Sequence, residues 1–156
     1  MIRIGHGYDV HRFTPERSLI LCGVEVTNEF GLAGHSDADV AVHALMDAIL
    51  GALAMGDIGH LFPDTDPAFK DANSMMLLMD VAERMNAKGY TLGNLDITII
   101  AEEPKLSPFI PEMRGNLASV FNCDINKVSI KATTEEGLGL AGMGIGAHAN
   151  VLLMMQ

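Results

Sequence analysis

Gly5-His6-Gly7-Tyr8-Asp9-Val10-His11 follows the apolar start of the chain, and residues 2–10 are predicted to form a first strand. Successive side chains of a strand point to opposite faces, so Asp9 and His11 project from the same face. Carboxylate and imidazole are both zinc ligands, and this spacing would hold them side by side. A surface Asp and His at the end of a strand explain the spacing equally well, because D-x-H is a short and common pattern.

A predicted helix within residues 34–53 carries a third metal-ligating side chain. Ser36 is its expected N-cap, with Asp39 three residues later, where a capping box usually has Glu. Asp39, His43 and Asp47 then follow at helical spacing and form a narrow polar stripe. This stripe is either a solvent-facing or packing surface, or it brings His43 to the Asp and His of the first strand. The second interpretation gives a three-ligand zinc site with an open fourth position, which is typical of catalytic zinc, and lets Asp39 or Asp47 orient the imidazole.

Strands and helices alternate along the rest of the chain. Further strands are predicted at 19–26, with Gly23 as a bulge or tight corner, at 95–101 and at 127–132, and helices at 74–88 and from Ser107 to about Phe121. The apolar run Met75 to Met79 is expected to fill the core or an interface. We therefore expect one α/β (α+β) domain over residues 1–156, with a mixed sheet covered by helices on one face.

Two polar loops and a glycine-rich segment each allow a structural and a functional interpretation. The aspartates of loop 54–67 suit turns, although an Asp flanked by glycines can also reach a sugar hydroxyl. Thr133-Thr134-Glu135-Glu136 is either a capping box at a short helical turn, or a hydroxyl and a carboxylate that face phosphate and a hard cation such as Mg²⁺. Residues 137–154 alternate Gly with apolar side chains, which indicates close backbone approach, such as at a symmetry axis.

The composition limits the function classes. Twenty acidic against ten basic residues give a formal charge of −10 over 156 residues, which argues against nucleic-acid binding because that needs a basic surface. An anionic substrate would then depend on backbone N–H groups and bound metal for its neutralisation. No leader or membrane-spanning run is found, and the two cysteines are far apart, so we expect a cytoplasmic protein that neither spans nor binds a membrane. The 49% apolar content also favours self-association.

Four groups of residues occur in one order along nearly the whole chain, from Ile2 to about Leu153. They are Gly5 to His11; His35-Ser36-Asp37-Ala38-Asp39 with His43; Gly56-Asp57-Ile58-Gly59 through Phe62-Pro63-Asp64-Thr65-Asp66; and Lys131-Ala132-Thr133-Thr134 with Glu136. Together they closely resemble the 2-C-methyl-D-erythritol 2,4-cyclodiphosphate synthase family of the non-mevalonate isoprenoid pathway. The resemblance implies a homotrimer with active sites between neighbouring subunits. It also implies a lyase that converts 4-diphosphocytidyl-2-C-methyl-D-erythritol 2-phosphate to the cyclic diphosphate and CMP.

The resemblance also implies roles for individual residues. Asp9, His11 and His43 match the zinc ligands, and Glu136 matches the ligand of a second cation, Mg²⁺ or Mn²⁺. His35 and Thr134 match the groups that stabilise the transition state. Asp57 and Gly59 match positions that hold the ribose, and the cytosine is read largely by the backbone of 101–107. The full set of implied substrate contacts is Asp9, His11, His35, Ser36, Asp57, Ile58, Gly59, Phe62, Pro63, Asp64, Thr65, Asp66, Ala101, Pro104, Lys105, Leu106, Ser107, Thr133, Thr134, Glu135 and Glu136.

Leu140 and Met143 depart from the family pattern, in which many bacterial members carry Phe and Arg. That Arg helps to bind a diphosphate ligand along the trimer axis, and Met143 cannot pair with a phosphate, so this role stays open. The length leaves no room for the cytidylyltransferase domain that bifunctional members carry. Two rival functions stay open as well: a zinc hydrolase that releases an uncyclised product, and a trimeric protein that binds metal or nucleotide without turnover.

Overall fold

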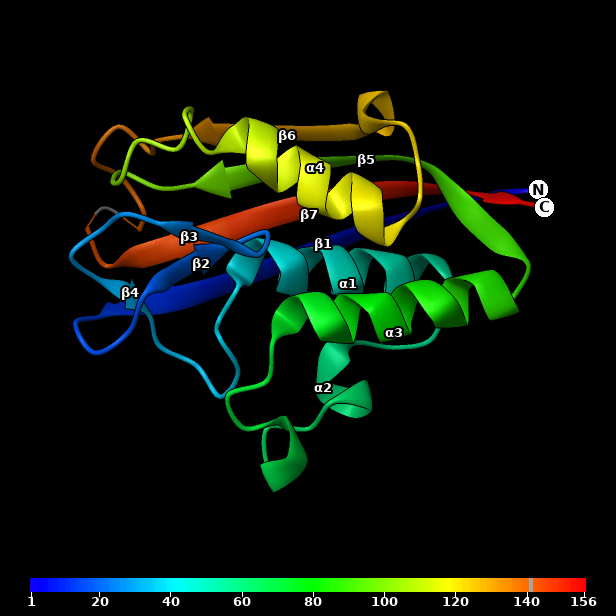
Figure 1. Cartoon of the computed structure of the whole chain (residues 1–156), viewed down its shortest axis with the longest axis horizontal. Coiled ribbons are helices and arrows are strands. Elements are labelled where there is room, and N and C mark those ends of the chain that lie inside the picture. Colours follow the sequence, from blue (N-terminus) through cyan, green and yellow to red (C-terminus); the bar gives the residue numbers. More distant parts are fainter. Residues whose placement is uncertain (141) are drawn as a thin grey trace.

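The structure is a computed structural model that describes residues 1–140 and 142–156, and these residues form a five-stranded sheet, a two-stranded hairpin and helices on one face of the sheet (Figure 1). The sheet order is β4-β1-β7-β5-β6, with β5 parallel to β6 and the other neighbours antiparallel. The predicted mixed sheet covered on one face is confirmed. The strands are β1 (Ile2–Thr14), β2 (Leu19–Leu21), β3 (Val24–Val26), β4 (Gly31–Leu32), β5 (Tyr90–Ile100), β6 (Val128–Thr133) and β7 (Gly144–Met155). The helices are α1 (Val40–Ala52), α2 (Ile58–Leu61), α3 (Ser74–Ala87) and α4 (Ile110–Val120), with short 3₁₀ turns η1 (Pro67–Phe69) and η2 (Ile125–Lys127).

Helix α1 lies directly on β1 because the strand presents glycines to it. A Cβ atom built on Gly7 would lie 1.9 Å from the carbonyl oxygen of Ala44, and one on Gly5 would lie 1.9 Å from that of Ala48. Only glycine allows two backbones to approach this closely. Odd-numbered residues of β1 therefore face α1, and this face includes Asp9 and His11, which lie on the same side as predicted. The close approach determines where the side chains of α1 sit relative to the strand.

Helix α1 begins later than predicted, and its N-cap is Asp39 and not Ser36. Ala38 has a positive φ of 57°, which interrupts the helical path before Asp39. The Asp39 carboxylate accepts hydrogen bonds from the backbone N–H groups of Val42, Cys22 and Gly23. Burial raises the pKa of Asp39 to about 6, although these backbone donors favour its charged form. The hydroxyl of Ser36 instead accepts from the N–H of Ala38, within the preceding turn.

Residues 19–26 form a hairpin, so the prediction of one strand was wrong. Strands β2 and β3 pair antiparallel, and Cys22 and Gly23 between them have φ values of 48° and 72°. Two consecutive positive φ angles are typical of the tight turns that close hairpins. The expectation of a tight corner at Gly23 is confirmed. The Asp39 carboxylate binds this turn, so the same side chain caps α1 and holds the hairpin against it.

Several element boundaries differ from the prediction. Strand β1 continues to Thr14, β5 starts at Tyr90, and α4 starts at Ile110 because Phe109 takes the N-cap position. The loop 54–67 contains α2, and residues 133–136 form no helical turn. Helix α3 agrees closely with the prediction, with Asn73 as N-cap and Gly89 at a positive φ after its end. Such differences arise because capping and turn geometry depend on tertiary contacts as well as on residue type.

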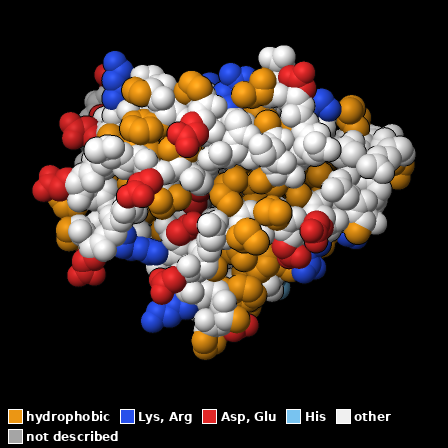
Figure 2. Space-filling view, viewed as in Figure 1, with side chains coloured by type: hydrophobic (Ala, Val, Ile, Leu, Met, Phe, Trp, Pro, Cys, Tyr) orange, Lys and Arg blue, Asp and Glu red, His pale blue; other side chains and the backbone are white. Residues whose placement is uncertain are grey.

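Two exposed methionines lie on α3. Figure 2 shows hydrophobic side chains gathered between α3 and α4 and toward α2. Leu78 is fully buried, whereas Met76 and Met79 on the same helix are 61% and 45% exposed. The prediction that this run fills the core or an interface is therefore confirmed for Leu78 in the core, and for the two exposed methionines an interface role stays a prediction. None of the helices in residues 1–140 and 142–156 is long and apolar enough to cross a membrane.

Candidate metal centre and substrate cavities

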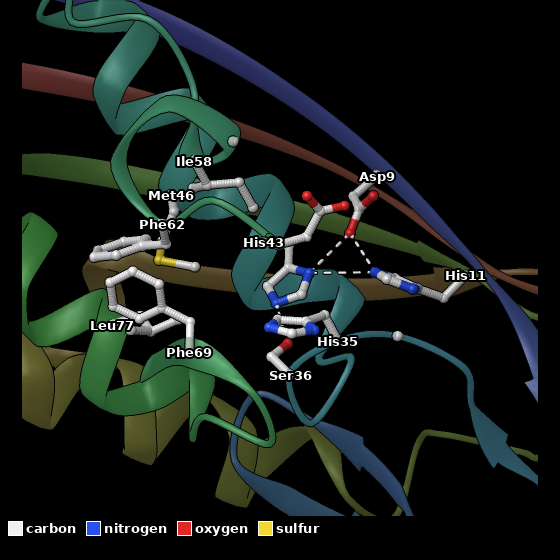
Figure 3. A pocket seen from close by; sticks show the side chains of 13 residues that line it. Asp9, His11, His35, Ser36, His43, Met46, Ile58, Phe62, Phe69 and Leu77 are labelled. Atoms are coloured by element: carbon white, nitrogen blue, oxygen red, sulfur yellow. Dashed lines mark hydrogen bonds and ion pairs between the residues drawn. The ribbon is translucent and has the colours of Figure 1, made fainter. Parts of the chain in front are cut away.

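Strand β1 and helix α1 bring three metal-ligating side chains together at one end of a cavity (Figure 3). The Asp9 Oδ2 atom is 2.9 Å from Nε2 of His11 and 3.1 Å from Nδ1 of His43. The two imidazole nitrogens are 3.2 Å apart. A tetrahedral zinc ion with bonds of 2.0–2.2 Å separates its ligand atoms by roughly 3.4 Å. The triangle is therefore close to the size that such an ion requires.

The hydrogen bonds behind the two histidines suit a metal ligand. His11 Nδ1 is 2.6 Å from the backbone carbonyl oxygen of Ala33, which can only accept, so Nδ1 carries the proton and Nε2 presents its lone pair to the centre. Nε2 of His43 lies 2.9 Å from the Ser74 hydroxyl and 3.1 Å from that of Ser36, which leaves Nδ1 to face the centre. Metal-ligating histidines usually donate their second N–H in this way. The donor set therefore fits a divalent cation.

The electrostatics at this corner favour positive charge. Burial alone would raise the pKa of Asp9, but hydrogen bonds to His11 and His43 outweigh it and hold the pKa of this carboxyl well below its usual range. Burial alone would lower the pKa of His11, but the hydrogen bond to Asp9 and the negative charge of Asp9 outweigh it and raise the pKa of this imidazole. A carboxylate that stabilises an imidazolium would also stabilise a divalent metal ion in the same place.

The expected orienting carboxylates do not contact His43, so that prediction was wrong. Asp39 is used by the backbone of its own helix and of the β2–β3 turn, and Asp47 accepts a hydrogen bond from the N–H of Ile58 at the start of α2. Burial is the main cause that raises the pKa of Asp47. Both aspartates therefore hold elements in place, and serine hydroxyls contact the imidazole of His43 instead.

The cavity beside the three ligands has a volume of about 430 Å³ and gathers many of the residues expected at the site. Its lining includes the expected residues Asp9, His11, His35, Ser36, His43, Ile58, Gly59, Phe62 and Asp64. Sequence reasoning missed its apolar wall of Met46, Phe69 and Leu77. Met46 lies three residues after His43 on one helix, a spacing that could have indicated it. The cavity is thus polar at the ligand triangle and apolar opposite, where Phe62 and Phe69 pack edge to face (Figure 3).

A second cavity, of about 700 Å³, contains a separate group of expected residues. It is lined by the whole expected segment 101–107 and by Thr133 and Thr134, and the unexpected residues Asn28 and Ala132 complete its lining. Glu102 holds the loop after β6, because its carboxylate accepts hydrogen bonds from the N–H groups of Glu135 and Gly137. No described residue lines both this cavity and the one at the metal-ligating triangle. The expected substrate contacts of one chain therefore fall into two separate cavities.

The remaining expected residues lie near these cavities without lining them. Asp57 caps α2 and Asp66 caps η1, which confirms turn chemistry for these two loop aspartates. The Thr134 hydroxyl lies 3.3 Å from the Glu136 carboxylate, in the loop after β6. Residues outside the two linings are Asp57, Pro63, Thr65, Asp66, Glu135 and Glu136. Leu140 and Met143 line a smaller hollow together with Val10, His11, Arg12 and Gly144.

Comparison with known proteins places the chain in a family. The sequence model of the YgbB family matches residues 2–156. A 2-C-methyl-D-erythritol 2,4-cyclodiphosphate synthase of Trichlorobacter lovleyi is 58% identical over 99% of this chain and 100% of that protein. A synthase of the same name from Clostridioides difficile is 55% identical, over 99% and 97% of the two chains.

Solved structures of cyclodiphosphate synthases have the same fold as this chain. A 2C-methyl-D-erythritol-2,4-cyclodiphosphate synthase in a CDP-bound form superposes with a TM-score of 0.91 at 37% identity, over 97% of this chain and all of that one. The bifunctional IspDF of Campylobacter jejuni superposes with a TM-score of 0.95 at 44% identity, and this chain spans 43% of its length. The family model matches nearly the whole chain, so the chain belongs to the YgbB family. Its curated relatives bear the name of cyclodiphosphate synthases, so the family resemblance of the sequence is confirmed.

Proposed function

We propose that this chain converts 4-diphosphocytidyl-2-C-methyl-D-erythritol 2-phosphate to 2-C-methyl-D-erythritol 2,4-cyclodiphosphate and CMP in the cytoplasm. An oxygen of the 2-phosphate attacks the β-phosphorus and forms the new P–O–P bond. The bond from the β-phosphorus to the bridging oxygen breaks, and CMP leaves with that oxygen. The single observation that carries the proposal is the triangle of Asp9, His11 and His43 beside a cavity, in a chain so similar to synthases over its full length.

The residues of the chain supply position and charge, because the nucleophile belongs to the substrate. Asp9, His11 and His43 would hold a zinc ion, which would supply Lewis-acid stabilisation to a phosphoryl oxygen. Glu136 would hold a second cation, Mg²⁺ or Mn²⁺, with the phosphates. His35 and Thr134 would donate hydrogen bonds where negative charge develops. An acidic chain with net charge −10 needs such cations to bind an anionic substrate.

The proposed roles of the other residues follow the two cavities. Residues 62–66, of which Phe62 and Asp64 line the first cavity, would enclose the methylerythritol portion, and Asp57 with Gly59 would hold the ribose. The segment 101–107, which lines the second cavity, would read the cytosine through its backbone. A substrate that needs both part-sites fits a homotrimer in which neighbouring subunits each contribute one of them.

The uncovered sheet face supports self-association. Ile2, Ile4 and Tyr8 alternate along β1 on the face opposite the helices, and they are 66%, 77% and 47% exposed. His6 lies between them on the same face and pairs with Asn150 of β7, so this face mixes apolar and polar side chains, as the surfaces between protein subunits commonly do. We propose that two further copies of this chain cover it.

Subunit mixing tests the shared site. His43→Ala and Thr134→Ala each impair one part-site, so each homotrimer should be strongly impaired. When the two variants are co-expressed and trimers form at random, about a quarter of the sites should combine an intact His43 from one subunit with an intact Thr134 from its neighbour. We expect about a quarter of wild-type turnover from the mixture. Mixed trimers with no more activity than the single variants would show that each site lies within one chain.

Phosphorus NMR of the reaction tests the function itself. The purified chain with Zn²⁺ and Mg²⁺ should yield the cyclic diphosphate and CMP in equal amounts, and thorough chelation should stop the reaction until metal is restored. An uncyclised phosphate product would indicate a zinc hydrolase. Binding of CDP without turnover of the substrate would indicate a nucleotide-binding protein. Full turnover after chelation would contradict the role of the metal.

A further inference from the structure

Behind His43 lies a buried chain of polar groups that the proposed reaction does not use. The imidazole Nδ1 faces the metal-ligating triangle, while Nε2 lies 2.9 Å from Oγ of Ser74, a residue with no exposed surface. Ser74 is the first residue of α3, and its backbone N–H donates to Oδ2 of Asp37 over 3.0 Å. Its hydroxyl donates to the other oxygen, Oδ1, of the same carboxylate. Helix α3 is thus tied to the loop before α1 at this point.

The direction of these hydrogen bonds fixes the tautomer of His43. An ionised carboxylate can only accept, so the Ser74 hydroxyl proton points to Asp37. The Ser74 oxygen then presents a lone pair to His43, and Nε2 must carry a proton to make that contact favourable. A histidine protonated on Nε2 has its lone pair on Nδ1, which lies 3.1 Å from Asp9 Oδ2 and 3.2 Å from His11 Nε2. Asp37 and Ser74 form a hydrogen-bonded relay to His43, and the tautomer that this relay selects is the one that can bind a metal.

We propose that Asp37 and Ser74 are positioning residues that set His43 in advance as a metal ligand. Neither residue lines the cavity at the triangle: Ser74 contacts the imidazole, and Asp37 contacts Ser74. The inference rests on the metal centre of the proposed function. The groups behind a ligating histidine typically contribute 10–100-fold to metal affinity, because they fix the tautomer and the ring direction. Ser74 and Asp37 thereby take the part that the sequence suggested for Asp39 or Asp47.

Two other contacts are less suitable for a test. His11 is oriented by a backbone carbonyl, that of Ala33, which no substitution removes. Ser36 also contacts Nε2 of His43, but it lines the cavity, so its loss would combine effects on substrate and metal. Substitutions at Ser74 and Asp37 test the relay alone, because these residues do not line the cavity.

The test measures zinc affinity of the full chain by competition with a chromogenic chelator. Ser74→Ala is expected to weaken Zn²⁺ binding about 10–100-fold, and Asp37→Asn about 3–10-fold, since its amide oxygen can still accept from Ser74. The matched control is Asn73→Ala, which removes the side-chain cap of α3 without touching the relay. This variant should lower the Tm and leave the zinc affinity unchanged. It thereby separates destabilisation of α3 from loss of the hydrogen bond to His43.

The visible spectrum of the Co²⁺-substituted protein gives a second readout, because it reports the geometry of the ligands. It should change in Ser74→Ala and Asp37→Asn but not in Asn73→Ala. If Ser74→Ala does not fold, Asp37→Asn carries the test. Wild-type zinc affinity and an unchanged Co²⁺ spectrum in the folded relay variants would overturn the relay alone. A wild-type chain that binds no zinc would overturn the proposed metal centre, and the relay with it.

Discussion

Replacing His43 with alanine is expected to abolish stoichiometric zinc binding and to lower turnover by at least about 1,000-fold. The side chain supplies one of three ligand atoms, and the two that remain, on Asp9 and His11, cannot hold a catalytic zinc ion with comparable affinity. Metal stabilisation of a phosphoryl transition state amounts to several kcal/mol, and each 1.36 kcal/mol is tenfold in rate. Metal analysis of the purified variant and a CMP-release assay measure both effects.

The variant should remain folded, which separates loss of the ligand from loss of structure. Most of α1 is buried through apolar side chains that this substitution does not change. His60→Ala is a matched control, because this histidine lies on α2, its side chain is 87% exposed, and it is not one of the three ligands. It should keep the wild-type zinc content. A His43→Ala protein that still binds one zinc ion per chain and turns over normally would contradict the three-ligand centre.

The ligand triangle could be predicted from the sequence because it depends on two simple periodicities. Alternation along a strand places Asp9 and His11 on one face, and the third ligand needed only a helix that packs on that face. The cap of this helix was less predictable. Ser36 and Asp39 are both good N-cap residues, and the choice between them depends on the positive φ of Ala38, a residue type that rarely adopts it.

Other features depend on contacts between distant segments. The hairpin turn places a cysteine at a φ of 48°, which no turn propensity indicates, and the carboxylate of Asp39 stabilises it from 17 residues away. Ser74 reaches His43 only because the long loop before α3 returns to the start of α1. Spacing along the chain also did not indicate that the expected contacts separate into two cavities, because that depends on how distant segments pack.

Substituting Gly7 with alanine is expected to produce the largest loss of stability. The added Cβ would lie 1.9 Å from the carbonyl oxygen of Ala44 and 2.8 Å from the backbone nitrogen of Ala48. These are backbone atoms within α1, so no side chain can turn away to make room, and the helix must lift from β1. Overpacking a core commonly costs 1–3 kcal/mol, and a clash between two backbones should exceed about 3 kcal/mol, a large share of a typical total stability. Urea unfolding followed by circular dichroism measures the change.

Gly51→Ala provides the matched control on the same helix. A Cβ there meets only the carbonyl oxygen of His6, at 4.0 Å, and the backbone of Gly51 is helical. Alanine lowers the backbone entropy lost on folding, so this variant should be more stable than wild type by up to about 1 kcal/mol. The same lifting of α1 in Gly7→Ala would move His43 away from Asp9 and His11, so zinc affinity should fall together with stability in Gly7→Ala and stay constant in Gly51→Ala. A Gly7→Ala protein with wild-type stability and zinc affinity would show that the distance between α1 and β1 does not determine the metal centre.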